Sequence, residues 1–319
     1  MKKYFVISLA VLFLVCGCGS KNEALFKQAV RLNAAGDISG ALKTYNAILR
    51  NDGKYLPALI NRAIIYEQMR EYKMAEEDYK KAYEINPRHL ELLNNMGSFN
   101  ISQGRPLSAI YYLNQALDIK PNYFTALLNR SAAYNAIDKI ESAAQDINDA
   151  VAISPSSSAA LEQRALINLR RLYVIEAVED LTKALNSGPY NAKNYYRRGI
   201  AFKQARKYAN AMADFDTAIR LKPDYVDALY ARAQLHFKNV DHYSALADVN
   251  TIKSINNEFV PAYELAGDIN AIEDPVQAVA NYLAARKLNP NNARRYNAKI
   301  ALMRTEEGRR RVITRTFME

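Results

Sequence analysis

The stretch "RLKPDYVDALYARA", residues 220–233, places a proline between two segments whose apolar residues recur at helical spacing. A proline inside a helix removes a backbone hydrogen bond and clashes with the preceding turn. Pro223 therefore predicts that one helix ends before it and that another begins after it. Similar breaks occur in "INPRHLELLNNMG" (85–97), "IKPNYFTALLNRS" (119–131) and "ISPSSSAALEQRA" (153–165).

The breaks recur with a period of 34 residues. The prolines that keep this step, with one residue lost before the last, are Pro87, Pro121, Pro155, Pro189, Pro223 and Pro290. The alanines that keep it without any insertion are Ala41, Ala75, Ala109, Ala143, Ala177, Ala211 and Ala245. At the chain's alanine content, six further coincidences have odds on the order of 1 in 100,000, so the chain is an internal repeat.

Within residues 192–225 the repeated positions are aromatic or small. They are Tyr195, Gly199 and Phe202 in the first helix, then Ala211, Phe215 and Ala218 in the second, before Pro223. This pattern resembles the tetratricopeptide repeat, a helix–turn–helix unit of about 34 residues. A second series of small residues is expected to meet the alanine series, so that the two helices approach closely: Ala63, Gly97, Ser131, Ala165, Gly199, Ala233 and Gly267.

The resemblance implies an all-α fold, a right-handed α-solenoid of eight helix–turn–helix units over residues 22–291. The units are 22–55, 56–89, 90–123, 124–157, 158–191, 192–225, 226–259 and 260–291. A helix pair cannot bury its apolar face alone, so the units are expected to stack into one elongated core. Residues 292–319 are predicted to form a basic C-terminal capping helix and tail.

Arginine and aspartate are correlated between the repeats. Five units have arginine at repeat position 7 and aspartate at position 23, and the other three units have neither. The pairs are Arg62 with Asp78, Arg130 with Asp146, Arg164 with Asp180, Arg198 with Asp214, and Arg232 with Asp248. We predict an ion pair between the two helices of each of these units, with a structural role.

The first 18 residues, "MKKYFVISLAVLFLVCGC", have two lysines, an apolar run and small residues, as in a secretory signal. The end of this segment resembles the lipobox of bacterial lipoproteins, with Cys18 as the acylated residue and 19–21 as a short tether. An ordinary signal peptide is the alternative. No cysteine follows Cys18, which leaves no disulfide framework. The resemblance implies a membrane-anchored envelope lipoprotein, in the outer membrane facing the periplasm because Gly19 and Ser20 carry no retention signal.

The formal net charge of +10 would become +8 after removal of Lys2 and Lys3. Residues 294–319 hold eight Lys/Arg and three Asp/Glu, a net charge of +5. This basic end could bind an anionic lipid or an envelope polymer, or it could be a solvated terminal helix.

Repeats of this family bind partners in a concave groove lined by their first helices. Carried onto this chain, the early groove is apolar to neutral: Phe26, Val30, Ile60, Ile64, Asn94, Ser98 and Leu128. The later groove mixes aromatic and cationic residues: Arg170, Lys193, Tyr196, Ile200, Lys203, Gln204, Tyr230, Gln234, Phe237 and Lys238. Opposing acids are expected at Glu162, Asp227, Glu264 and Asp268. Such a surface suits an acidic or carboxylate-bearing peptide or helix, although the tyrosines could instead pack on neighbouring repeats.

No residue set for catalysis is visible. His89, His236 and His242 have no partner at metal-ligand spacing, and there is no phosphate-binding loop and no nucleophile elbow. The sequence therefore predicts a protein–protein interaction scaffold or adaptor in assembly of an envelope complex, not an enzyme. No cofactor, metal or small-molecule substrate is expected. Nucleic acid is not expected either, because acids lie in the groove. The alternative function is a surface binder that acts through the basic tail.

Overall fold

The computed structural model describes residues 21–188 and 190–318, with side chains as far as Val312. The expected signal segment, Cys18, residues 19 and 20 of the tether, and Pro189 lie outside the described residues. The chain divides into two compact units, Met1–Arg171 and Leu172–Glu319, and the division falls between the two helices of the fifth predicted repeat. The sequence predicted one elongated core over all eight repeats, whereas the structure divides the chain into two compact units.

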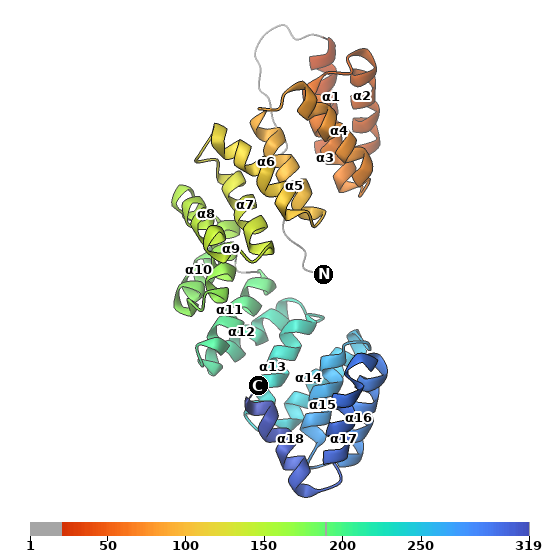
Figure 1. Ribbon diagram of the computed structural model, residues 1–319, viewed down its shortest axis with the longest axis vertical. Coiled ribbons are helices and arrows are strands. Elements are labelled where there is room, and N and C mark those ends of the chain that lie inside the picture. The colour runs from red at the N-terminus through yellow and green to blue at the C-terminus, as the bar shows by residue number, and fades with distance from the viewer. Residues whose placement is uncertain (1–20, 189, 319) are drawn as a thin grey trace. The chain divides into compact units, whose positions relative to one another are not determined.

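Unit 1 is a succession of antiparallel helices (Figure 1), each packed against the helix before it and the helix after it. The helices are α1 (Lys21–Ala34), α2 (Ile38–Asn51), α3 (Leu56–Gln68), α4 (Tyr72–Ile85), α5 (Leu90–Ser102), α6 (Pro106–Ile119), α7 (Phe124–Ala136), α8 (Ile140–Ile153) and α9 (Ser158–Arg170). Helices α3, α5, α7 and α9 begin at the residues where the 34-residue period places the start of a repeat.

Unit 2 continues the pattern and ends in two further helices. Its elements are α10 (Val174–Ser187), α11 (Ala192–Gln204), α12 (Tyr208–Leu221), α13 (Val226–Lys238), α14 (His242–Ile255), α15 (Val260–Asn270), α16 (Pro275–Leu288), η1 (Pro290–Asn292), α17 (Ala293–Leu302) and α18 (Glu306–Met318). No strand occurs in the described ranges, and consecutive helices pair. The all-α helix–turn–helix repeat fold is confirmed.

Small residues bring the two helices of each repeat together. All seven alanines of the 34-residue series have an exposed fraction of 0%. A Cβ atom added to Gly97 would lie 2.5 Å from Leu113 Cγ, and one added to Gly199 would lie 2.5 Å from Phe215 Cε1. Because neither neighbour has room to move in a packed core, the second helix uses the space that a first-helix side chain would fill.

Four of the predicted ion pairs have both residues in one compact unit, and all four are forked. Arg62 Nε donates to Asp78 Oδ2 and Arg62 Nη2 to Asp78 Oδ1, both at 2.7 Å. The same geometry, at 2.7–2.9 Å, joins Arg130 to Asp146, Arg198 to Asp214, and Arg232 to Asp248. Arg164 and Asp180 belong to different units, so that pair stays a prediction.

Each of these arginines also reaches the preceding repeat, which the sequence correlation did not predict. Its Nη1 donates to the residue sixteen positions earlier. The acceptors are Asn46 for Arg62, Asn114 for Arg130, Thr182 for Arg198 and Asp216 for Arg232. One guanidinium therefore fixes the hairpin of its own repeat and the junction with the repeat before it.

In seven of the eight repeats, the turn between the two helices contains a residue with positive φ. It stands at repeat position 15 in seven units: Gly36, Arg70, Gly104, Asp138, Leu172, Arg206 and Val240, with φ between 58° and 83°. Left-handed backbone costs an L-residue about 1–2 kcal/mol, and it is least favourable for a β-branched side chain. The turn therefore imposes strain at the non-glycine positions, most of all at Val240.

Replacing Val240 with glycine is expected to raise the free energy of unfolding of unit 2 by about 1 kcal/mol. The side chain is 70% exposed, so its removal sacrifices little packing. Urea denaturation followed by circular dichroism measures the change. The converse variant Gly104→Val should destabilise unit 1, and a loss of stability in Val240→Gly would contradict strain in the turn.

The C-terminal end differs from the predicted single capping helix and tail. Residues 293–318 form a helical hairpin, α17 and α18, and α17 packs on α16. Tyr296, Met303 and Val312 are buried in it. The predicted capping helix corresponds to α17, whereas the buried Val312 of α18 was not anticipated in the charged run that follows.

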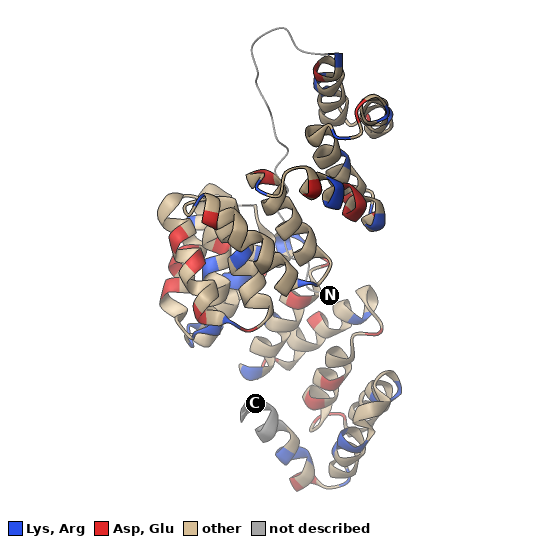
Figure 2. Ribbon diagram, turned by 45° about the horizontal axis from the view of Figure 1, so that its top comes forward, with Lys and Arg blue, Asp and Glu red and all other residues tan. Residues whose placement is uncertain are grey.

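Charges of both signs are interleaved along the helices (Figure 2). In the basic run of α18, Arg310 and Arg311 form ion pairs with Glu306 and Glu307, at 2.7 Å and 2.5 Å. None of the helices in the described ranges combines the length and the apolar character needed to cross a membrane.

Candidate functional site

The residues expected in the early groove lie inside unit 1 rather than on an open surface. Phe26, Ile60, Ile64, Asn94, Ser98 and Leu128 are buried, and Val30 is half-buried. Phe26 packs on Tyr45 and Tyr55, with ring centroids 6.0 Å and 5.9 Å away. Ile60 and Ile64 belong to the core cluster of Met96 and Phe99. The expectation of an open apolar groove here was wrong, because these side chains pack between successive first helices.

Among the buried polar side chains of α5 and α7, the sequence reasoning named Asn94 and Ser98 but missed Asn95 and Asn129. Asn129 Nδ2 donates to Asn94 Oδ1 at 3.1 Å, but both amide atoms of Asn95 and Ser98 Oγ are buried without a hydrogen bond to another described residue. The signal was present in the sequence, because Asn61, Asn95 and Asn129 keep the 34-residue step. Each unpaired buried group costs about 1–3 kcal/mol.

Glu67 on α3 is a half-buried carboxylic acid whose pKa is perturbed by burial. Burial raises the pKa of its carboxyl from 4.5 to about 7, although a hydrogen bond donated by the Tyr79 hydroxyl acts in the opposite direction. The folded protein therefore holds this proton more tightly than the unfolded chain does. The resulting stabilisation is complete below pH 4.5 and is lost as the pH rises through 7.

Ionisation of Glu67 is accordingly expected to lower the free energy of unfolding of the wild type by about 2 kcal/mol between pH 5 and pH 8. Glu67→Gln should not show this loss. Glutamine keeps an oxygen that accepts from Tyr79 but does not ionise. Urea denaturation at both pH values measures the effect, with the exposed Glu71→Gln as the control. Equal pH dependence in wild type and Glu67→Gln would contradict the assignment.

The later groove residues fall in both units. Arg170 belongs to unit 1, where its guanidinium donates to the Asn135 carbonyl at 3.0 Å and pairs with Asp138. It therefore links α9 to the end of α7 and is not grouped with the residues of unit 2. Phe237 is only 2% exposed, in the core cluster of Val249 and Leu265, so its placement in an open groove was wrong.

The remaining residues of unit 2 define what we call the α11–α13 face: Tyr196, Ile200, Lys203, Gln204, Tyr230, Gln234 and Lys238. Tyr196 is half-buried, with ring centroids 6.1 Å from Phe215 and 5.2 Å from Tyr225. Tyr230 packs edge-on against Phe259 at 5.5 Å. Both rings therefore pack against aromatic side chains of their own repeats and keep only part of their surface accessible. Lys193 is exposed at the start of α11, beside Tyr190 in a shallow hollow.

The two lysines of the α11–α13 face form hydrogen bonds with neutral groups. Half-buried Lys203 Nζ donates to Gln234 Oε1 at 2.7 Å, and exposed Lys238 Nζ donates to the Tyr208 hydroxyl at 2.7 Å while lying 4.4 Å from the centre of that ring. Burial, together with repulsion from Lys238, lowers the pKa of Lys203. The hydrogen bond from Lys238 lowers the pKa of Tyr208. The face thus holds two neighbouring cations that are not neutralised by these partners.

Two of the four acids expected to oppose these cations, Glu264 and Asp268, are engaged mainly by the C-terminal hairpin, whereas Asp227 is exposed on α13. Tyr296 donates to Glu264 at 2.5 Å and Arg295 pairs with it at 3.1 Å. Lys299 Nζ lies 2.6 Å from Asp268 Oδ1, and Asp268 also accepts from Tyr282. Because α16 and α17 satisfy these two carboxylates, Glu264 and Asp268 do not neutralise Lys203 and Lys238.

The histidines have local partners. His89 Nδ1 accepts from the Leu92 N–H at the start of α5, His236 pairs with Asp241, and His242 pairs with Glu273. Within the described ranges, no group of three or more His, Cys, Asp or Glu could hold a metal ion.

Comparison with known proteins agrees with the 34-residue period. Models of the family described as "Tetratricopeptide repeat" match residues 57–89 and 90–123, and a model described as "TPR repeat" matches residues 206–240. The chain is a tetratricopeptide repeat protein. No curated protein matches this tetratricopeptide repeat protein at the sequence level.

Solved structures share the tetratricopeptide repeat fold at low sequence identity. A tetratricopeptide repeat protein from Parabacteroides merdae is 20% identical, with a TM-score of 0.60, and the match covers 77% of this chain and 98% of that chain. PilW, a widely conserved type IV pilus biogenesis factor, is also 20% identical, with a TM-score of 0.60, over 65% of this chain and 96% of that chain. The APC/C hetero-tetramer Cut9-Hcn1 gives 12% identity and a TM-score of 0.61, over 93% of this chain and 56% of that chain.

Proposed function

We propose that this tetratricopeptide repeat protein is a membrane-anchored, non-enzymatic scaffold that binds a carboxylate-bearing segment of a partner protein on the α11–α13 face. The observation that carries the proposal is Lys203, a half-buried ammonium group whose hydrogen-bond partner, Gln234, is neutral. Burying a charge without a counter-charge is costly. A carboxylate brought by the partner would offset that cost and form a charge-assisted hydrogen bond.

The surroundings of Lys203 fit a peptide rather than a small ion. Lys238 lies close enough to lower the pKa of Lys203, so a second carboxylate would find a cation nearby. Gln204 is exposed beside them and offers both a donor and an acceptor to a peptide backbone. The accessible parts of Tyr196 and Tyr230 supply aromatic surface of the kind that anchors partners.

Photo-cross-linking in the native cell tests this binding surface. A photoreactive amino acid at exposed Gln204 is expected to capture a partner through an acidic or carboxylate-bearing segment, and Lys203→Met with Lys238→Met should reduce the adduct at least tenfold. A photoreactive residue at Ala213, exposed on α12, is the matched control. The proposal fails if position 204 captures nothing or if the adduct survives both substitutions.

The anchor and the location are also part of the proposal. They are supported by the signal-like residues 1–18 and by the lipobox-like end at Cys18. PilW shares the fold, which makes assembly of an envelope complex, with the scaffold on the periplasmic side of the outer membrane, the first process to examine. Metabolic labelling with an alkyne fatty acid should modify the wild type and not Cys18→Ser. Equal labelling of the two would exclude Cys18 as the anchor.

A further inference from the structure

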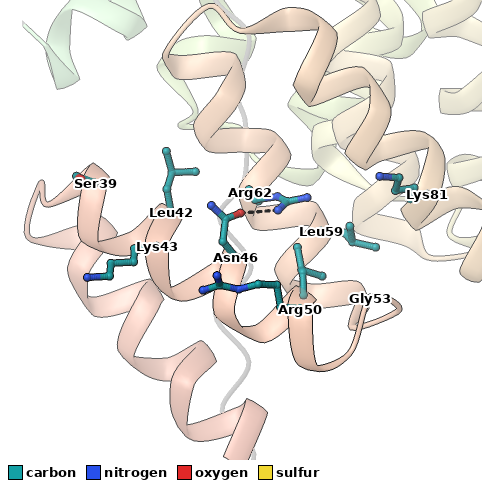
Figure 3. A pocket seen from close by; sticks show the side chains of 10 residues that line it. Ser39, Leu42, Lys43, Asn46, Arg50, Gly53, Leu59, Arg62 and Lys81 are labelled. Carbon is teal, nitrogen blue, oxygen red and sulfur yellow. Dashed lines mark hydrogen bonds between the residues drawn. The ribbon is translucent and has the colours of Figure 1, made fainter.

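Unit 1 contains a hollow that the α11–α13 face does not involve. It has a volume of about 800 Å³ and lies where α2, α3 and α4 meet. Figure 3 shows Lys43 and Arg50 extending from α2, Lys81 from α4, and Arg62 of α3 between them. Arg62 is held in place by Asp78 and by Asn46, whose Oδ1 it contacts at 2.5 Å.

The charged side chains that line this hollow are all cationic. Lys43, Arg50 and Lys81 are exposed, none of them forms an ion pair with an acid in the described part of the chain, and no carboxylate lines the hollow. Cations that line one cavity without a counter-charge repel one another, and a bound anion would relieve that repulsion.

The other repeats supply an internal comparison. Lys43 and Arg50 stand at repeat positions 22 and 29 of one unit, and Lys81 stands at position 26 of the next. At the following junction the equivalent residues are Glu77, Glu84 and Gln115. At the junction after that they are Tyr111, Asp118 and Asp149. No later junction has more than one cation at these positions. Three cations at this junction are therefore a local property and not a consequence of the repeat.

Hydrogen-bonding capacity shows which kind of anion fits. The lining side chains offer donors from Lys43, Arg50 and Lys81, but the only side-chain acceptors among them are Ser39 Oγ and Asn46 Oδ1, and the latter already accepts from Arg62. A peptide brings backbone N–H groups that need acceptors, whereas a phosphate group brings acceptors alone. The walls therefore favour phosphate over an acidic peptide.

The floor of the hollow is apolar. Leu59 is only 1% exposed, and Leu42 and Leu49 are half-buried. We propose that this hollow binds a phosphate group attached to an apolar body, as in a phospholipid headgroup or a soluble phosphate ester. Lys43, Arg50 and Lys81 would hold the phosphate by charge-assisted hydrogen bonds, and the leucines would cover part of the apolar body.

Calorimetric titration of the purified protein tests the site with three probes: inorganic phosphate, glycerol phosphate and dihexanoyl phosphatidic acid. We expect all three to bind, and Arg50→Gln with Lys81→Gln should weaken binding at least tenfold. Lys183→Gln and Arg220→Gln, at the same repeat positions in other units and also exposed, should leave binding unchanged. A lipid that binds at least tenfold more tightly than glycerol phosphate supports a headgroup, and equal binding supports a soluble ester.

Three outcomes would overturn the proposal. Binding that persists in the Arg50/Lys81 variant would place the phosphate elsewhere, and equal loss in the Lys183/Arg220 control would show attraction to net charge alone. A hexaglutamate peptide that binds as tightly as the phosphate probes would assign the hollow to a protein partner. Circular dichroism of each variant shows that the helices remain folded.

Discussion

Arg130→Ala is expected to lower the free energy of unfolding of unit 1 by about 3 kcal/mol, the largest effect of any substitution considered for this protein. The Asp146 side chain is 5% exposed and accepts both arms of the guanidinium fork. Removing Arg130 leaves that carboxylate buried without a counter-charge. It also breaks the hydrogen bond to Asn114 of the preceding repeat, at 2.9 Å.

A double-mutant cycle separates the ion pair from other losses. In the Arg130→Ala background, Asp146→Ala should cost little more, or even restore stability, because it removes the unpaired carboxylate. Urea denaturation of the four proteins measures the coupling energy. Fully additive losses would show that the pair is not a structural unit. Lys139→Ala, an exposed cation in the same hairpin, should change stability by less than about 0.5 kcal/mol.

Gly199→Ala is expected to lower the free energy of unfolding of unit 2 by about 2 kcal/mol, the second largest effect. The new methyl group would lie 2.5 Å from Phe215 Cε1, and Phe215 is fully buried between α11 and α12. The two helices must therefore separate, or the ring must leave its position. Thermal denaturation of unit 2 measures the loss.

Gly188→Ala, in the same unit, is the matched control, because its new methyl group would meet nothing closer than the Ala184 carbonyl oxygen, at 3.8 Å. That variant should keep wild-type stability or gain slightly by restricting the unfolded chain. If Gly199→Ala were equally neutral, close approach at the small-residue series would not determine how the two helices pack.

The helices, and the contacts that recur from one repeat to the next, could be predicted from the sequence. Pro223 and its equivalents mark where helices end, and the residue three positions later starts the next helix in α7, α9 and α13. The arginine–aspartate correlation predicted the ion pairs because eight related units in one chain act as an internal alignment. What repeats every 34 residues could be predicted.

Features without a constant residue type could not be predicted in this way. The positive φ at repeat position 15 falls on glycine in only two of seven units, since the turn is fixed by the helices on both sides and tolerates strained residues. Phe237 was assigned to an open surface because it occupies a groove position, but it packs against Val249. Whether a groove position is exposed depends on the size of its neighbours in the next repeat, which a single repeat does not specify.

The occupied acids Glu264 and Asp268 were misjudged for a related reason. Their partners come from α17 and from Tyr282, and α17 lies beyond the eight predicted units. Lys203 and Gln234 were both assigned to the groove from the sequence, but the hydrogen bond that joins them was not predicted.

Affinity for a partner segment that differs only in charge tests the central claim most directly. The segment cross-linked to position 204 would be made as a peptide with its carboxylates intact and as a peptide with amides in their place, and each would be titrated into wild type and Lys203→Met by calorimetry. We predict that the carboxylate peptide binds wild type at least tenfold more tightly than the amide peptide, and that Lys203→Met abolishes the difference. Equal affinity of the two peptides for the wild-type protein would contradict the account.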